Sequence, residues 1–393
     1  MSKRIGMEVS IAAAEAVALC RIDVAAVYPI TPSTHIAEHL SSIVSDGKLD
    51  AEFITVESEH SAMSGIMGAS AAGARAFTAT GSQGVMYMHE MLPVASAMRL
   101  PVVMAIGNRA VSGPLNILND HGDIMMERDT GWISLFAQNG QEVIDMIIQA
   151  FRIAEHKDVM LPVNVNIDGF ILTHMVEAMD MPDQDEIDRF LPPFVPYATL
   201  HPDRPVSMGT FAGNDIYTEI SKSKDAALIN AKKTILQIWK EWEKLFGRKY
   251  EPIESYRADD AEILLLTMGS MGETAEMAID ALRAKGMSVG LLKFKLWRPF
   301  PFDELKKAVK GAKILTVIDR AISYGGPGGP LGIEVRSALY DESSRPAIFN
   351  YIIGLGGRDV TPEDFMTILK SSASQAKKKA MKERYVIYGV RES

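Results

Sequence analysis

Residues 51–84 read AEFITVESEHSAMSGIMGASAAGARAFTATGSQG, and the pattern in this stretch indicates the fold class. An apolar run of β-forming residues opens it and leads into a helical segment of alanine, glycine and serine at 58–73. The run ARAFTAT follows, and a methionine-rich helix is expected at about 84–98. A strand followed by a helix, twice in succession, is typical of parallel strands joined by crossover helices.

The same alternation continues on both sides of this stretch. Upstream, VAAVYPI at 24–30 precedes a helix expected at 35–45. Downstream, the apolar runs LPVVMAIG and LPVNVNID lie before and after a helix expected near 141–156. Such runs indicate buried parallel strands with helices on both faces of the sheet. The sequence therefore predicts a doubly wound α/β domain, in which ligands bind at the carboxyl ends of the strands.

The second half of the chain contains another α/β pattern. A proline-rich stretch without periodicity fills about 190–215, and a long helix with an apolar stripe is expected at 216–246. Alternation then resumes, with helices expected at 272–285 and 303–310. We predict four segments: a first α/β domain at 1–190, a linker and long helix at 191–257, a second, smaller α/β domain at 258–370, and a C-terminal tail at 371–393.

The composition is that of an acidic, soluble globular protein. Of 393 residues, 47% are hydrophobic and 23% are charged, and the formal net charge is -9. Because a protein that binds nucleic acid needs a basic face, no nucleic-acid partner is expected. Glu8 and Glu15 interrupt the apolar N-terminal stretch, which we interpret as an amphipathic helix and not a signal peptide. No uncharged apolar run is long enough to span a membrane, so we expect a cytoplasmic protein.

The cysteine content limits the redox chemistry of the chain itself. Cys20 is the only cysteine in the sequence. No intrachain disulfide can form, and this chain alone cannot hold an iron–sulfur cluster, which needs several thiolates.

Polar residues follow four of the expected strands at the point where each one ends. Thr31 follows the first in YPITPST, Glu59 follows the second, the loop at 81–84 follows the third, and Arg109 follows the fourth. Since the carboxyl ends of parallel strands meet at one edge of a sheet, these residues can converge on one crevice. An arginine there is well suited to hold a carboxylate through two hydrogen bonds.

Both charged residues in this set have a structural alternative. Arg109 can instead form an ordinary salt bridge, with Asp120 or Asp123 of NDHGD as its partner. Glu59 can be a carboxylate that only favours the start of its helix, through the helix dipole. The sequence alone does not choose between these interpretations and a binding site.

Two other motifs suggest ligands at first sight. His35 and His39 in HIAEH have the spacing of a zinc-binding helix. However, Pro32 and Ser33 place His35 in the first turn of the helix, where it makes a poor ligand platform, so we favour a solvated or interface helix. The glycines of YGGPGGPLG at 324–332 fit a tight strand-to-helix loop, with a backbone nest for an anion as the alternative.

Several long motifs together resemble the α subunit of the multi-subunit 2-oxoacid:ferredoxin oxidoreductases, and the pyruvate enzyme most closely. In chain order they are YPITPST, ESEHSAMSGIMGASAAGARAFTATGSQG, LPVVMAIGNRAVSGPLNILNDHGDIM, RDTGWI, VNIDGFILTH, FGRKYEPIESYRADDAE and GLGGRDVT. The resemblance covers almost the whole chain. It implies a pyrimidine-type thiamine diphosphate-binding domain followed by a smaller domain like the C-terminal domain of transketolase.

The resemblance also implies an activity and a set of partners. The activity is thiamine diphosphate-dependent oxidative decarboxylation of pyruvate with coenzyme A, giving acetyl-CoA and CO2, with electrons passed to ferredoxin. In this family the α subunit supplies the pyrimidine half of the cofactor site, and the β subunit supplies the diphosphate and metal half. Partner β, γ and δ subunits would therefore carry Mg2+ and 4Fe-4S clusters, which agrees with the single cysteine of this chain.

Site residues carry over from the family position by position. Glu59 matches the glutamate that hydrogen-bonds the aminopyrimidine ring nitrogen and so activates the cofactor. Thr31 and Arg109 match residues that contact the substrate, with Arg109 pairing with its carboxylate. No metal ligand is assigned to this chain. The loop assigned to cofactor binding consists of Gly81, Ser82 and Gln83.

Three other functions stay open at this point. Branched-chain 2-oxoacid enzymes share YPITP and the NRA region, so 2-oxoisovalerate is an alternative substrate, while 2-oxoglutarate and oxalate fit less well. A second alternative is a non-catalytic assembly subunit. The third is a zinc hydrolase built on His35 and His39.

Overall fold

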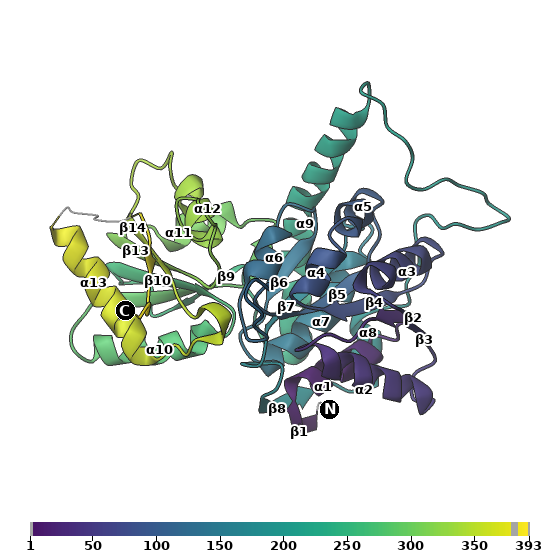
Figure 1. Ribbon diagram of the computed structural model, residues 1–393, viewed down its shortest axis with the longest axis horizontal. Coiled ribbons are helices and arrows are strands. Elements are labelled where there is room, and N and C mark those ends of the chain that lie inside the picture. The colour runs from purple at the N-terminus through teal and green to yellow at the C-terminus, as the bar shows by residue number, and fades with distance from the viewer. Residues whose placement is uncertain (1–2, 379–383, 392–393) are drawn as a thin grey trace.

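The computed structural model describes residues 3–378 and 384–391. They form two α/β bodies that lie side by side, each built around its own sheet (Figure 1). A small antiparallel sheet pairs β1 (Lys3–Glu8) with β8 (Val176–Met181) at the edge of the first body. No helix among the described residues combines the length and the apolar character needed to cross a membrane.

The first sheet has seven strands in the order β12-β6-β7-β5-β4-β2-β3. Neighbouring strands run parallel, except that β12 pairs antiparallel with β6. The central strands β4, β5 and β7 are buried throughout, as expected, but the edge strand β3 is largely exposed. The bounds are β2 (Val24–Val27), β3 (Glu52–Thr55), β4 (Ala76–Thr80), β5 (Val103–Asn108), β6 (Ile133–Phe136), β7 (Val163–Asp168) and β12 (Leu296–Arg298).

Helices cover both faces of this sheet, which confirms the doubly wound prediction. Alternate residues of β5 enter two different cores, since Val103 packs with α1, α2, α7 and α9 while Met104 packs with α3, α4, α5 and α6. The bounds are α1 (Val9–Leu19), α2 (Thr34–Ser45), α3 (Glu59–Ala71), α4 (Gln83–Tyr87), α5 (Met91–Ala97), α6 (Gly122–Met126) and α7 (Gly140–Ala154).

Two local predictions in this body are wrong. The N-terminal stretch is not one amphipathic helix, because the strand β1 comes first. The helix that follows, α1, is rich in alanine and is buried on almost every face. The helix expected at 84–98 is interrupted between α4 and α5. Pro93 has no N–H to donate to the carbonyl of His89, which explains why one continuous helix does not pass through this turn.

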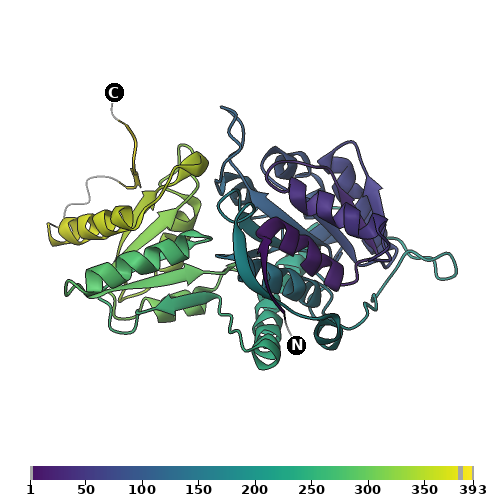
Figure 2. The same ribbon diagram turned by 90° about the horizontal axis from the view of Figure 1, so that it is seen from below.

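The second sheet has six strands in the order β15-β14-β13-β10-β11-β9, with β9 antiparallel to β11 and the other pairs parallel. Figure 2 shows α10 and α13 side by side over one face, and α11 and α12 pack into the core on the other. The bounds are β9 (Ile253–Tyr256), β10 (Ile263–Met268), α10 (Met271–Arg283), β11 (Val289–Phe294), α11 (Phe302–Ala308), β13 (Ile314–Asp319), α12 (Pro330–Ala338), β14 (Ala347–Ile352), α13 (Pro362–Lys377) and β15 (Val386–Ile387).

The connection between the two bodies is irregular and then helical. After α8 (Gln184–Phe190), residues 191–216 contain no helix or strand, as the proline-rich sequence predicts, and α9 (Tyr217–Phe246) follows. Figure 1 shows the N-terminal part of α9 and the preceding loop projecting from the first body. The domain boundaries at 190, 257 and 370 stay a prediction. Within the tail at 371–393, residues 379–383 and 392–393 lie outside the described residues.

Candidate active site

The YPITPST loop packs directly on the ends of the central strands. It connects β2 to α2, and Pro32 within it is buried. A Cβ atom added to Gly107 would lie 3.1 Å from the Cγ atom of Pro32, and one added to Gly169 would lie 2.7 Å from it. Gly107 near the end of β5 and Gly169 after β7 thus let the proline ring approach the strand ends, and Thr31 is held beside them.

Arg109 follows β5 and reaches across to this loop. Its Nη1 donates a hydrogen bond to the carbonyl oxygen of Thr31 at 2.9 Å, and its Nε donates to the carbonyl of Asn116 at 3.0 Å. The side chain forms no salt bridge with Asp120 or Asp123, so that alternative is wrong. Among the residues that the structure describes, none accepts a hydrogen bond from Nη2. Arg109 is only 7% exposed, and burial lowers the pKa of its guanidinium.

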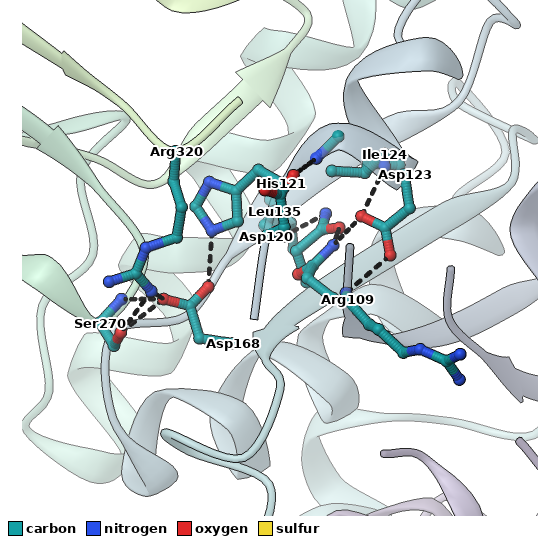
Figure 3. Close-up of polar contacts among 12 residues, drawn as sticks. Arg109, Asp120, His121, Asp123, Ile124, Leu135, Asp168, Ser270 and Arg320 are labelled. Atoms are coloured by element: carbon teal, nitrogen blue, oxygen red, sulfur yellow. Dashed lines mark hydrogen bonds and ion pairs between the residues drawn. The ribbon is translucent and has the colours of Figure 1, made fainter. Parts of the chain in front are cut away.

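Asp123 fixes two of the strand ends through its buried carboxylate. It accepts hydrogen bonds from the backbone amides of Ser82 (2.9 Å) and Arg109 (3.0 Å) and from the side chain of Asn108 (3.1 Å). Burial raises the pKa of Asp123 to about 6, although these hydrogen bonds oppose the rise. Figure 3 shows the Arg109 guanidinium directed away from this carboxylate.

The loop at 81–84 follows β4 and leads into the first turn of α4, which starts at Gln83, as the sequence predicts. Ser82 has a positive φ of 52°, and its hydroxyl donates to the carbonyl of Ala110 at 2.6 Å, so this loop and the one after β5 are bonded together. The side-chain nitrogen of Gln83 is buried without a hydrogen-bond partner. Since buried polar groups are normally hydrogen-bonded, this amide lacks an acceptor that the described residues do not supply.

Glu59 is the first residue of α3, and Ser58 caps the helix by accepting the amide of Ser61. The Glu59 side chain is nevertheless buried, and burial raises its pKa. A Cβ atom on Gly84 would lie 2.7 Å from Oε1 of Glu59 and would also overlap the hydroxyl of Thr80. That hydroxyl is buried and has no partner. The glycine therefore brings the carboxylate and the loop at 81–84 into contact.

The residues predicted from strand ends lie along one edge of the sheet. In the strand order β5-β4-β2-β3 they follow four consecutive strands, with Arg109 after β5, the loop at 81–84 after β4, Thr31 after β2 and Glu59 after β3. Arg109 and Thr31 are joined by a hydrogen bond, and Glu59 lies against Gly84. No hydrogen bond joins Glu59 to either Arg109 or Thr31 within the described part of the chain.

A second buried cluster at this edge was not identified from the sequence. Asp168 ends β7 and bonds to His121 (2.6 Å), to Arg320 (2.9 Å) after β13, and to the amide of Ser270 (3.0 Å) after β10. Burial alone would raise the pKa of Asp168, but His121 and Arg320 hold it below its ordinary value. Figure 3 shows the Arg320 guanidinium and Ser270 together on one side of the Asp168 carboxylate, with His121 above it. The two sheets therefore meet at their carboxyl edges.

The remaining motifs have local partners. His35 is hydrogen-bonded to Glu8 at 2.6 Å, and His39 to Glu15 at 2.7 Å. In residues 3–378 and 384–391, no group of three or more histidine, cysteine or acidic side chains is arranged to hold a metal ion.

The glycine-rich stretch connects β13 to α12 as a strand-to-helix loop. Asp319 already accepts the amides of Leu331 (2.8 Å) and Gly332 (2.9 Å) in the first turn of that helix. These two N–H groups are therefore not free for an external anion, which argues against the nest alternative there.

Two family models match the chain. Residues 15–240 match the thiamine diphosphate-binding domain of pyruvate flavodoxin/ferredoxin oxidoreductase, and residues 261–365 match core domain II of pyruvate:ferredoxin oxidoreductase. The chain belongs to the pyruvate flavodoxin/ferredoxin oxidoreductase family, whose members are oxidoreductases.

Individual proteins of this family are similar in sequence to this chain over nearly its whole length. Pyruvate synthase subunit PorA of Methanothermobacter thermautotrophicus is 47% identical over 91% of this chain and 92% of its own. The PorA subunit of Pyrococcus horikoshii is 49% identical over 92% of this chain and 91% of its own. Ketoisovalerate oxidoreductase subunit VorA of Pyrococcus abyssi is 43% identical over 91% of this chain and 90% of its own.

A solved structure supports the fold. The chain superposes on 2-oxoglutarate:ferredoxin oxidoreductase from Magnetococcus marinus with a TM-score of 0.71 at 20% identity. The match covers 94% of this chain and 65% of that longer chain, so this protein spans about two thirds of its length. At this level of identity the likeness concerns the fold alone.

The residues at the strand ends fit the aminopyrimidine half of thiamine diphosphate. Glu59 offers a buried carboxylate with a raised pKa, and no side chain in the described ranges donates a hydrogen bond to it. The unpartnered Thr80 hydroxyl and Gln83 amide lie in or beside the same loop, and Gly84 leaves the carboxylate room. A neutral ring that carries both donors and acceptors would satisfy such groups.

Proposed function

We propose that this chain is the α subunit of a pyruvate:ferredoxin oxidoreductase, which converts pyruvate and coenzyme A to acetyl-CoA and CO2 and passes the electrons to ferredoxin. The pyruvate synthase subunits that are 47% and 49% identical over more than nine-tenths of the chain support this assignment. The site at the strand ends supports it independently, since it combines a cation for a 2-oxoacid with a buried carboxylate for the cofactor.

The main support for this function is the hydrogen bond by which the Arg109 guanidinium is held against the carbonyl of Thr31. The guanidinium is buried, and two of its three nitrogens are fixed by the carbonyls of Thr31 and Asn116. A buried cation without an anionic partner is costly, and a substrate carboxylate on the free Nη2 edge offsets that cost. Arg109 thereby orients the 2-oxoacid, and Thr31 contacts it from the loop after β2.

Glu59 and the neighbouring loop would hold the aminopyrimidine of thiamine diphosphate. When bound, this cofactor supplies the electron sink that decarboxylation of a 2-oxoacid requires. Glu59 would hold a proton at the ring nitrogen, a task for which its raised pKa is suited. The loop formed by Gly81, Ser82 and Gln83 would border the same ring, and its position is fixed by Asp123.

Partner subunits are part of the proposal. With Cys20 as the only cysteine, the chain cannot itself ligate the 4Fe-4S clusters that carry electrons to ferredoxin. We assign these clusters, and the Mg2+ that accompanies the cofactor diphosphate, to β, γ and δ subunits of a cytoplasmic complex. In this chain, residues 1–190 would form the cofactor domain and 258–370 the transketolase C-terminal-like domain, joined by 191–257 and followed by the tail at 371–393.

A panel of 2-oxoacids assayed with the intact complex tests the proposal. Pyruvate should support dye reduction that depends on coenzyme A, and thiamine diphosphate and iron should co-purify with the complex. A complex that contains neither cofactor and oxidises no 2-oxoacid would instead support the non-catalytic assembly subunit.

The branched-chain enzyme is the second candidate, because the VorA subunit is 43% identical over 91% of the chain. The same panel separates the two. A higher kcat/KM for 2-oxoisovalerate than for pyruvate would replace the pyruvate assignment.

A further inference from the structure

The loop at 110–120, which follows Arg109, has few internal bonds. Most of its residues are exposed, and it contains no helix or strand. The amide of Ala110 bonds to the carbonyl of Leu118 at 3.0 Å and closes the loop. Asn116 lies inside it, where its Oδ1 accepts the amide of Leu118 at 2.7 Å and its carbonyl accepts Nε of Arg109 at 3.0 Å. The position of Arg109 therefore depends on where this loop is held.

The second body holds the loop from outside. Nδ2 of Asn116 donates to the carbonyl of Gly356 at 3.0 Å, and the amide of Gly357 donates to the carbonyl of Asn119 at 2.7 Å. The amide of Gly356 also reaches Oδ2 of Asp120 at 3.3 Å. Three hydrogen bonds thus join one short glycine turn after β14 to the loop that bonds Arg109.

This contact requires glycine on the second body. Gly356 and Gly357 have φ values of 58° and 77°, which other residues rarely adopt. A Cβ atom on Gly356 would lie 2.5 Å from Nδ2 of Asn116, and one on Gly357 would overlap Leu118. The two backbones can approach this closely only because both side chains are absent.

The base of the contact is also fixed. The amide of His121, directly after the loop, donates to the carbonyl of Arg320 at 2.9 Å, and Arg320 pairs with Asp168 at 2.9 Å. All of these groups are buried. The second body therefore offers a rigid support, and the Asn116 side chain connects this support to the Asn116 backbone carbonyl that Arg109 bonds.

We propose that Asn116 is a positioning residue, through which the second α/β body orients the Arg109 guanidinium and so sets the affinity of the site for the carboxylate of a 2-oxoacid. This inference rests on the proposed function, because it needs Arg109 to bind that carboxylate. It adds a role for the second body, which otherwise contributes no side chain to the proposed substrate contacts.

The test uses the intact complex with Asn116→Ala and, from the other side of the contact, Gly356→Ala. Each should raise the KM for the 2-oxoacid about fivefold, the effect of losing one orienting hydrogen bond, while kcat and the KM for coenzyme A stay unchanged. Leu115→Ala is the matched control, since this residue of the same loop is 76% exposed. It should leave the KM unchanged, and the complexes with Asn116→Ala and Leu115→Ala should unfold thermally near the wild-type temperature, whereas Gly356→Ala should unfold somewhat lower because alanine is strained at a φ of 58°.

A double-mutant cycle separates positioning from a general loss of structure. In an Arg109→Lys background the Nε donor to Asn116 is gone, so Asn116→Ala should have no further effect on the KM. The inference would be overturned if Asn116→Ala raised the KM for the 2-oxoacid equally in the wild-type and Arg109→Lys complexes. It would also be overturned if Asn116→Ala left this KM unchanged in the complex that retains Arg109. A wild-type complex that oxidises no 2-oxoacid would contradict the proposed function itself, and the two failures are therefore distinguishable.

Discussion

The backbone amide of Arg109 donates to the carboxylate of Asp123 at 3.0 Å, whereas its guanidinium turns away to the carbonyl of Thr31. One acidic residue thus fixes the end of β5 without neutralising the cation that follows it. Since the same carboxylate accepts the amide of Ser82, it also sets the loop after β4. The positions of the substrate-binding and cofactor-binding segments are therefore coupled through Asp123.

Asp123→Asn should loosen both strand ends at once. An amide in place of the carboxylate directs its NH2 group at one of the N–H donors, and each buried donor left unpaired costs about 1 to 3 kcal/mol. We expect the free energy of unfolding in urea to fall by this amount and kcat/KM for the 2-oxoacid to fall with it. Asp129→Asn is the control, because its side chain is 78% exposed, and it should change the stability by less than about 0.5 kcal/mol. Equal stability of the two variants would remove Asp123 from its structural role.

The pH dependence of stability should carry a signature of the same carboxyl group. The pKa of Asp123 is raised to about 6, above its ordinary value of about 4, so the folded protein binds a proton that the unfolded chain releases in this interval. Its contribution to stability is full below about pH 4 and is lost as the pH rises through 6. Asp319 has a similar pKa of about 6 and adds to the slope. Urea unfolding measures the free energy of unfolding at each pH. Its decline from pH 4 to 6 should be smaller in Asp123→Asn than in the wild type.

Arg109→Ala should weaken substrate binding. Removing a charge-assisted hydrogen bond to the carboxylate costs about 1.5 to 3 kcal/mol, which corresponds to roughly a ten- to hundredfold higher KM for the 2-oxoacid. Steady-state kinetics of the complex measures this change, with the KM for coenzyme A as the internal control. If the KM for the 2-oxoacid does not change, Arg109 does not bind the substrate.

Much of the fold follows from the sequence because burial and periodicity are local signals. The run that became β5 is apolar up to its last residue, the run that became β7 alternates aliphatic with polar residues, and the lengths of both give the strands within a few residues. The local sequence does not predict that β3 is exposed, because its exposure comes from its place at the edge of the sheet, and that place depends on the order of the strands. The N-terminal β1 was missed for a related reason, since its partner β8 lies far away in the sequence.

The placement of Thr31, Glu59 and Arg109 at one edge of the sheet was predictable because each follows a strand within a few residues, and their roles stay a prediction. Asp168 offered the same signal at the end of LPVNVNID and was overlooked. Its bond to Arg320 joins residues 152 positions apart, and no local pattern predicts such a pairing. The sequence also named Asp123 as a partner of Arg109 but not that the bond would involve the backbone amide.

Arg320→Met should destabilise the chain strongly. The substitution leaves Asp168 buried opposite a methionine, and breaking a buried ion pair on one side typically costs about 3 to 5 kcal/mol. Urea unfolding measures the loss. Arg21→Met provides the comparison, because its pair with Asp188 is exposed, and it should cost less than about 1 kcal/mol. Similar losses in both variants would contradict a supporting role for the pair between the sheets.

Glu59→Gln should abolish turnover while the complex still assembles. Glutamine keeps the size of the side chain but cannot exchange a proton with the cofactor ring, and general acid–base groups contribute about a hundredfold or more to rate. Glu57→Gln is the matched control, two positions earlier and exposed, where its side chain accepts a hydrogen bond from Ser61. The 2-oxoacid-dependent dye assay distinguishes the two variants. Full activity in Glu59→Gln would exclude Glu59 from catalysis.

Gly84→Ala tests the space beside Glu59 without changing any charge. The new Cβ atom would lie 2.7 Å from Oε1 of Glu59, so the carboxylate must shift. We expect the purified complex to retain less thiamine diphosphate than the wild type, as measured by its fluorescence after oxidation to thiochrome. Gly68→Ala in α3 is the control, since nothing lies within 4 Å of its added Cβ atom, and alanine favours the helix by about 0.5 to 1 kcal/mol. Equal cofactor content in both variants would show that Gly84 does not shape the cofactor site.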